Sequence, residues 1–224
     1  MNTDMAVRDI SLTGKDLDIV ETQLLLGQLY LDSGNFSHAF EMFSIAARSG
    51  RPRALNMLGR AYERAWGVPR DVLLAVKYFN AAVWEGDGWA AFNLGDVYLT
   101  GDGLPADKMR AYEYYLFAAQ KGVAKALNML GLLHEKGLYG SPDIDGARQF
   151  FRAAGEAGDC WACLNMGRLS LNENDVIGAA EWFERSLTFG FPEYWECLEA
   201  FLRAANAPAL QRIIFEVCRR SKIR

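Results

Sequence analysis

Residues 54–86 read ALNMLGRAYERAWGVPRDVLLAVKYFNAAVWEG, and versions of this stretch recur on both sides of it. Three markers identify each copy: a glycine in its first half, an aromatic residue in its second half, and a closing glycine. Successive markers of one kind lie 32 or 36 residues apart. The first glycines are Gly27, Gly59, Gly95, Gly131 and Gly167, the aromatic residues are Phe43, Phe79, Tyr115, Phe151, Phe183 and Phe215, and the closing glycines are Gly50, Gly86, Gly122, Gly158 and Gly190. A fixed period of this length is typical of a solenoid.

Each copy divides into two helices of similar length. Apolar residues recur at i, i+3, i+4 and i+7 on both sides of a polar connection, which predicts a first helix, A, and a second helix, B. We therefore expect an all-α fold, an α/α solenoid of about six helix pairs that forms a single domain over residues 16–220. The expected repeats are 20–50, 52–86, 88–122, 124–158, 160–190 and 193–218, after a flexible lead at 1–15.

Local signals support these boundaries. The first glycine of each copy lets helix B lie close to helix A, since it carries no side chain. The closing glycines suit the left-handed position that ends a helix. Asp71, Asp107 and Asp143 precede helix B in three copies, where a carboxylate accepts a hydrogen bond from a free backbone N–H. We interpret these aspartates as helix caps and not as catalytic acids.

The sixth copy is degraded, as expected of a repeat that caps a solenoid. Glu199 takes the glycine position, and Phe215 takes the aromatic position. The apolar faces expected in this copy consist of Cys197, Leu198, Phe201 and Leu202 in helix A and of Leu210, Ile213, Ile214, Phe215 and Val217 in helix B.

Composition and charge exclude several classes of function. The formal net charge of −4 gives no reason to expect binding to nucleic acid, which requires a basic surface. The chain contains no apolar run of about 18 residues that would span a membrane, and its start lacks the basic and apolar regions of a secretory signal. We expect a cytoplasmic protein without membrane insertion, whose four cysteines are reduced.

The motifs together resemble the Sel-one-like repeat, a relative of the tetratricopeptide repeat. The resemblance rests on LGxxY, a Gly-rich connection followed by Asp, an Ala-x-x-(Tyr/Phe)-(Tyr/Phe) helix and a closing Ala-Ala-x-x-Gly, and it covers about residues 20–218. The third copy, NLGDVYLTGDGLPADKMRAYEYYLFAAQKG, is especially similar to the family pattern. The resemblance implies a right-handed superhelix that acts as an adaptor and presents a concave face to a protein or peptide. In bacteria, such proteins are often linked to signalling, envelope processes or contact with hosts. The resemblance implies no catalytic residues.

Positions −6, −3, +1 and +4 from the first glycine face the concave groove in arrays of this type. The partner-binding candidates selected in this way are Arg60 in the second copy, Trp89, Phe92, Asp96 and Leu99 in the third, Lys125 and Asn128 in the fourth, and Trp161, Leu164 and Arg168 in the fifth. Large apolar side chains without a core to fill form an exposed patch, and such patches mark binding sites. Alternatively, Trp89 and Trp161 lie in the seam between repeats and belong to the core.

Cys160 and Cys163 form the one motif with catalytic associations, because CxxC occurs in redox and zinc sites. The chain offers no second pair at a matching spacing and no βαβ pattern, so we favour structural cysteines over a redox or metal role. His134 takes the tyrosine position of its copy and is expected to be packed and hydrogen-bonded. No metal or cofactor is expected.

The sequence therefore predicts a non-enzymatic helical-repeat adaptor or scaffold that binds a partner protein or peptide through the helix-A groove. We expect a monomer. An inhibitor or immunity protein that sequesters an effector is the alternative within the binding class. An enzyme, specifically a hydrolase, and a self-assembling structural protein are the alternatives from other classes.

Overall fold

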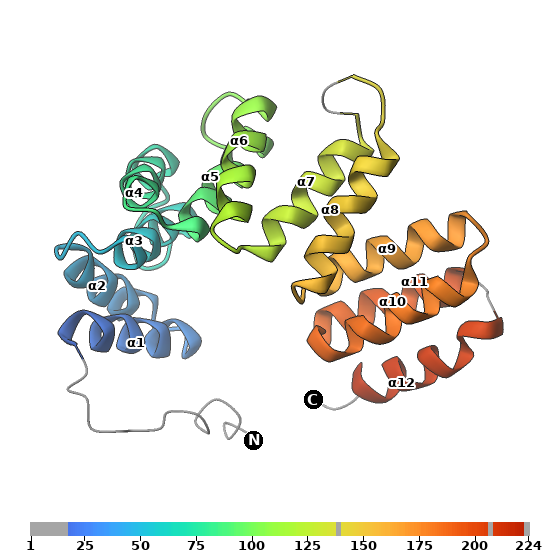
Figure 1. The fold of residues 1–224 in the computed structure, drawn as a ribbon. Coiled ribbons are helices and arrows are strands. Elements are labelled where there is room, and N and C mark those ends of the chain that lie inside the picture. The colour runs from blue at the N-terminus through green and yellow to red at the C-terminus, as the bar shows by residue number, and fades with distance from the viewer. Residues whose placement is uncertain (1–17, 138–139, 206–207, 222–224) are drawn as a thin grey trace. The chain divides into compact units, whose positions relative to one another are not determined.

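The computed structural model describes residues 18–137, 140–205 and 208–221. These residues form helices and no strand, and the helices follow one another in pairs along the chain (Figure 1). The helices are α1 (Ile19–Asp32), α2 (Phe36–Ala47), α3 (Pro52–Arg64), α4 (Val72–Trp84), α5 (Gly88–Thr100), α6 (Lys108–Gln120), α7 (Ala124–Glu135), α8 (Ile144–Glu156), α9 (Cys160–Asn172), α10 (Val176–Phe189), α11 (Pro192–Ala205) and α12 (Gln211–Ser221), with a 3₁₀ turn at Pro208–Leu210.

The all-α solenoid expected from the repeat is confirmed. Odd-numbered helices are the A helices and even-numbered helices are the B helices. Three B helices also pack against the A helix that follows them, namely α2 against α3, α6 against α7 and α8 against α9. The described residues divide into two compact units, one that ends at Tyr78 and one that begins at Phe79, so the boundary falls within α4. The expected lead at 1–15 lies outside the described residues.

A glycine and an aromatic ring pack together in four of the helix pairs. In the fourth copy, a Cβ atom on Gly131 would lie 2.5 Å from Cε1 of Phe151, which is closer than two non-bonded carbon atoms approach. The same relation joins Gly27 to Phe43, Gly95 to Tyr115, and Gly167 to Phe183. In each of these copies, the aromatic ring of helix B therefore packs directly against the first glycine of helix A.

Small residues on helix B flank each ring. Four residues before the aromatic marker stand Ala39, Ala75, Ala111, Ala147 and Ala179, and three residues after it stand Ala46, Ala82, Ala118, Ala154 and Ser186. All of these residues are fully buried. Because they lie on the same side of helix B as the ring, they bring the backbones of the packed helices close together.

The predicted caps are confirmed, and further aspartate caps occur on A helices. Asp71, Asp107 and Asp143 each accept a hydrogen bond from the backbone N–H three residues later, at 2.9, 3.0 and 2.9 Å. Asp87 and Asp159 cap α5 and α9 in the same way, at 2.6 and 2.7 Å.

One of the closing glycines has a different backbone conformation from the others. Gly50, Gly86, Gly122 and Gly158 adopt the left-handed conformation, with φ between 72° and 94°. The prediction is wrong for Gly190, whose φ of −70° and ψ of 158° are extended. A Cβ atom on Gly190 would lie 2.7 Å from Cδ1 of Tyr194, so close packing against α11 explains this glycine.

The sixth copy corrects the sequence analysis at two residues. Phe215 is 73% exposed, whereas Leu210, Ile213, Ile214 and Val217 are buried. Ile214 therefore takes the place expected for Phe215, and the buried row of α12, which follows the 3₁₀ turn at Pro208–Leu210, lies one residue earlier than the repeat period predicts. Cys197 is also exposed, while Leu198 and Leu202 on the same helix are fully buried.

Candidate partner-binding surface

An aromatic pair and a lysine lie together on the helix-A side of the second unit. Trp89 and Phe92, one turn apart on α5, meet edge to face with ring centroids 5.9 Å apart. Nζ of Lys125, from α7 of the next copy, lies 5.9 Å from the centroid of the Trp89 ring, which allows a cation–π contact. Trp89 is 50% exposed and Lys125 is exposed. These three residues are called the Trp89 patch below.

Phe92 connects this patch to the core, and Leu99, further along α5, packs against the same cluster. Both are partly buried and pack against the cluster that contains Tyr115 and Leu130. The ring centroid of Phe92 lies 5.7 Å from that of Tyr115. Phe92 therefore positions Trp89, and only part of its own ring is accessible to a partner.

The second predicted tryptophan lies in a different environment. The ring of Trp161 on α9 meets that of Tyr194 on α11 at a right angle, with centroids 5.1 Å apart. The ring of Phe191 lies 6.4 Å from that of Trp161 and 6.3 Å from that of Tyr194, so the three rings form one cluster. Trp161 and Leu164 both pack against the core cluster of the last two copies. Trp161 therefore packs against the core between repeats, as the alternative interpretation expected, whereas Trp89 at the corresponding position of its copy is exposed.

Two of the predicted polar residues are engaged within the repeats. The Tyr115 hydroxyl donates a hydrogen bond to Asp96 at 2.6 Å. Asn128 is buried and accepts a hydrogen bond from the Asn165 side chain of the next copy at 2.9 Å. These contacts explain both residues through folding, so we leave them out of the binding surface proposed below.

The two predicted arginines also have partners. Arg168 on α9 forms an ion pair with Glu135 on α7 at 2.7 Å, and both side chains are partly buried. In the first unit, the guanidinium of Arg60 lies 5.0 Å from the centroid of the Trp66 ring. Burial lowers the pKa of Arg60 from its ordinary value.

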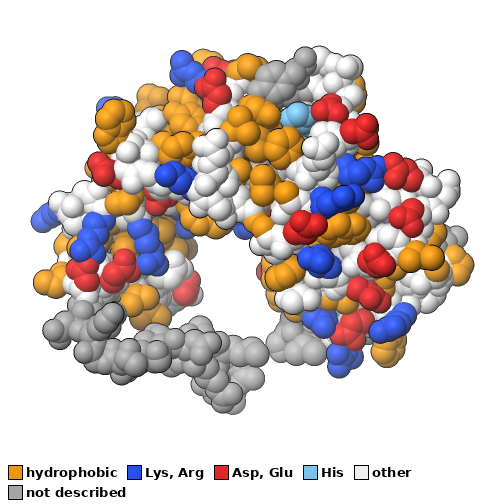
Figure 2. All heavy atoms as spheres, viewed as in Figure 1, with side chains coloured by type: hydrophobic (Ala, Val, Ile, Leu, Met, Phe, Trp, Pro, Cys, Tyr) orange, Lys and Arg blue, Asp and Glu red, His pale blue; other side chains and the backbone are white. Residues whose placement is uncertain are grey.

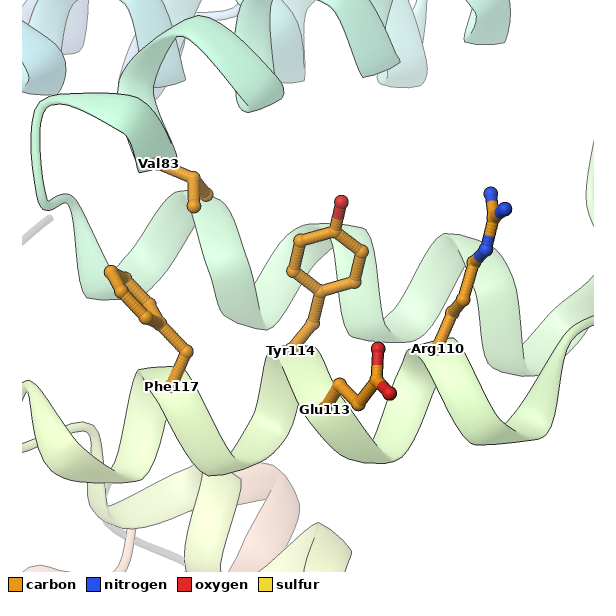
Figure 3. Close-up of a pocket in the computed structure, with 5 residues that line it drawn as sticks. All are labelled: Val83, Arg110, Glu113, Tyr114 and Phe117. Atoms are coloured by element: carbon orange, nitrogen blue, oxygen red, sulfur yellow. The ribbon is translucent and has the colours of Figure 1, made fainter.

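A pocket of about 330 Å³ lies between α4 and α6 in the second unit (Figure 3). Arg110, Tyr114 and Phe117 follow one face of α6, and Val83 points toward them from α4. Two of its polar groups are used within the chain, since Tyr114 donates a hydrogen bond to Asn80 at 3.0 Å and Arg110 lies 3.3 Å from Asp107. We therefore assign no ligand to this pocket.

The CxxC motif has the environment of a structural pair. Cys160 and Cys163 are buried and have free thiols. The pKa of Cys160 is raised to about 11 and that of Cys163 to about 12, mainly by burial. Among the described residues, no group of three or more His, Cys, Asp or Glu side chains is placed to hold a metal ion. The thiol form therefore predominates at neutral pH, which favours the structural interpretation.

Thiol labelling tests this interpretation. In the native protein, we expect Cys197 to react rapidly with a thiol reagent at pH 8 and Cys160 and Cys163 to react only when the chain unfolds. The reasons are burial and a thiolate fraction of roughly one in a thousand or less at that pH. Mass spectrometry of labelled peptides measures the order of reaction. Rapid native labelling of Cys160 or Cys163 would contradict the structural assignment.

His134 is packed and hydrogen-bonded, as predicted. Its Nδ1 lies 3.0 Å from Oδ2 of Asp143, and its Nε2 lies 3.2 Å from the hydroxyl of Tyr112 on the preceding B helix. The ring of Phe150 lies 5.0 Å away, centroid to centroid. Tyr62 with Tyr78 and Tyr98 with Tyr114 form equivalent ring contacts in other copies. His134 therefore fills the structural position of the repeat tyrosine.

The surface of the described residues is mixed in character. Figure 2 shows hydrophobic side chains gathered over the region of α6 and α7, whereas positive and negative side chains alternate over α8 to α12. Within the described ranges, no helix is long and apolar enough to cross a bilayer.

Comparison with known proteins agrees with the repeat. The family model described as Sel1 repeat matches residues 20–50, 52–83, 90–123 and 124–159. These matches correspond to the first four copies, and the fifth and sixth helix pairs lie beyond them. No curated protein is similar enough to count as a match.

Solved structures share the fold. A Sel1 repeat protein from Oxalobacter formigenes has a TM-score of 0.74 and 22% identity, and the similarity covers 91% of this chain and 87% of that one. A protective antigen of uropathogenic Escherichia coli with an SLR fold has a TM-score of 0.71 and 22% identity, over 90% of this chain and 45% of that one. An immunity protein from Pseudomonas aeruginosa has a TM-score of 0.62 and 16% identity, over 87% of this chain and 80% of that one.

Proposed function

Because the chain belongs to the Sel1 repeat family, whose repeats are helical scaffolds for protein interaction, we propose that it is an adaptor that binds a partner protein through the Trp89 patch. The observation that carries this proposal is the exposure of half of the Trp89 side chain, beside Phe92 and Lys125. Tryptophan is among the residues most often found as binding hot spots.

The chemistry of the patch indicates what it would bind. The Trp89 ring offers a flat apolar surface, and the lysine ammonium beside it offers a charge. A partner segment that places an apolar side chain on the ring and an acidic group near Lys125 would satisfy both. Burial of the ring by the partner supplies affinity, while the charge favours one orientation.

Affinity capture from the native host tests the proposal, and the chain supplies a matched control. Trp84, on the B helix α4, is 89% exposed, so Trp84→Ala removes an equally large ring from another surface. We expect Trp89→Ala to weaken binding by about 30-fold, the effect of about 2 kcal/mol, and Trp84→Ala to leave it unchanged. Equal loss with both variants, or no loss with Trp89→Ala, would contradict the proposed patch.

The same experiment separates an adaptor from an inhibitor. An immunity protein that sequesters an effector would bind one effector per chain and release it slowly. The fold shared with an immunity protein from Pseudomonas aeruginosa makes this the second candidate, although a likeness at 16% identity concerns the fold alone. Sedimentation of the purified complex measures the ratio of the two chains.

A further inference from the structure

A cavity of about 670 Å³ opens on the second unit, where the end of α9 and the start of α10 face α11. Its volume lies within the range of ligand-binding pockets. The apolar side chains that line it include Leu171, Val176, Phe201 and Ala204. Arg168, Asn172 and Asn174 line it as well, and Arg168 is the only charged residue among the described residues that do so.

The sequence explains why this cavity exists. Five residues after the first glycine, the first five copies carry polar side chains, namely Asp32, Arg64, Thr100, Lys136 and Asn172. The corresponding residue of the sixth copy is Ala204, and Ala205 follows it. The two methyl groups leave space opposite Leu171 and Val176, and the connection between α9 and α10 is one of the short ones.

The charges distinguish this cavity from the others. The pocket between α10 and α12 is lined by residues of both signs, including Glu216 and Arg220, which pair with each other at 2.8 Å. The α4–α6 pocket likewise holds both Arg110 and Glu113. In contrast, the α9–α11 cavity is lined by apolar side chains, two amide side chains and one cation, Arg168, whose carboxylate partner Glu135 is not among the lining residues.

The carboxylates around the α9–α11 cavity have partners of their own. Glu173 pairs with Arg148, and Asp175 accepts the backbone N–H of Gly178 as the cap of α10. Glu135 receives one N–H of Arg168, through Nη2. A guanidinium has five N–H donors in a planar fork, so Arg168 retains donors for a second carboxylate.

We propose that the α9–α11 cavity binds the C-terminal residue of a partner peptide, with an apolar side chain in the cavity and the free carboxylate on Arg168. Asn172 and Asn174 supply further N–H donors at the rim. This inference extends the proposed function, since it requires a protein partner. It adds a second binding site, distinct from the Trp89 patch.

The test uses the full chain and a defined probe, the acetylated tetrapeptide GSGL with a free carboxylate, compared with the same peptide as its C-terminal amide. Changes in backbone amide chemical shifts, followed to millimolar peptide, report the affinity and the residues affected. We expect the free acid to shift residues 171–176 and the amide to bind at least about tenfold more weakly, because the charge-assisted bonds are lost.

Three variants test the cavity. Arg168→Gln removes the cation, and Ala204→Phe fills the space; each is expected to weaken binding of the free acid at least about tenfold. Glu135→Gln removes the carboxylate that competes for Arg168, so we expect it to tighten binding. Arg185→Gln is the matched control, since Arg185 lies over the Trp182 ring on α10 and does not line the cavity.

The outcomes separate this inference from the proposed function. Loss of peptide binding with Arg168→Gln and its retention with Trp89→Ala would support an independent carboxylate site. Equal binding of acid and amide, unchanged binding with Arg168→Gln, or no shift at millimolar peptide would each overturn the inference. Those results would leave capture of a partner through Trp89 as a separate question with its own variants.

Discussion

Replacement of Phe151 by alanine is expected to lower the free energy of unfolding by about 3–5 kcal/mol, the usual cost of removing a buried aromatic ring. The ring is fully buried, rests on Gly131 and packs with Met166 and Leu169 of the next copy. Its loss therefore opens a cavity inside one helix pair and at the junction with its neighbour. Urea unfolding followed by circular dichroism measures the change.

The matched control is Phe215→Ala. The repeat period places Phe215 at the same position of the sixth copy, yet 73% of this residue is exposed. We expect its replacement to change the free energy of unfolding by less than about 0.5 kcal/mol, as for other surface substitutions. A similar cost for both variants would show that Phe215 is packed and that the register of α12 described above is wrong.

Much of the fold could be predicted because each copy repeats the same physical requirements. A glycine packs against the aromatic ring, alanines flank the ring, and an aspartate caps the next helix. Each copy therefore supports the same interpretation of the others. The prediction failed at Phe215 and Gly190, where the repeat gives way to the terminal pair. There α12 follows a 3₁₀ turn at Pro208–Leu210, and Tyr194 lies close to Gly190. A fixed period predicts neither feature.

The candidate site was harder to predict because exposure depends on the neighbouring copy. Trp89 and Trp161 occupy the same position, and the sequence left open whether either belongs to the core. The next A helix presents Lys125 to Trp89 but Tyr194 to Trp161, so the first ring remains accessible and the second is packed. The sequence contained one indication of the cavity beside Arg168, the alanine at position 204. That alanine indicates a cavity only when the packing of α11 against α9 is known.

A second large effect is expected at Asp96, the acceptor of the Tyr115 hydroxyl. Asp96→Leu should lower the free energy of unfolding by about 1–3 kcal/mol, because it leaves a buried hydroxyl without its acceptor. The hydrogen bond is 2.6 Å long. Burial, together with the nearby Asp96, raises the pKa of Tyr115, so the hydroxyl remains protonated and needs an acceptor across the neutral range.

The fourth copy shows how the loss can be repaired. It carries Leu132 and Phe151 where the third carries Asp96 and Tyr115, and its ring seats on Gly131 as that of Tyr115 does on Gly95. Asp96→Leu combined with Tyr115→Phe recreates that apolar pair and is expected to recover most of the lost stability, because no unsatisfied hydroxyl remains. Denaturant unfolding of both variants measures the difference. If the double variant is no more stable than Asp96→Leu alone, Asp96 stabilises the fold through other contacts. If the double variant is stable but no longer captures the partner, Asp96 contributes to partner binding as well as to the hydrogen bond with Tyr115.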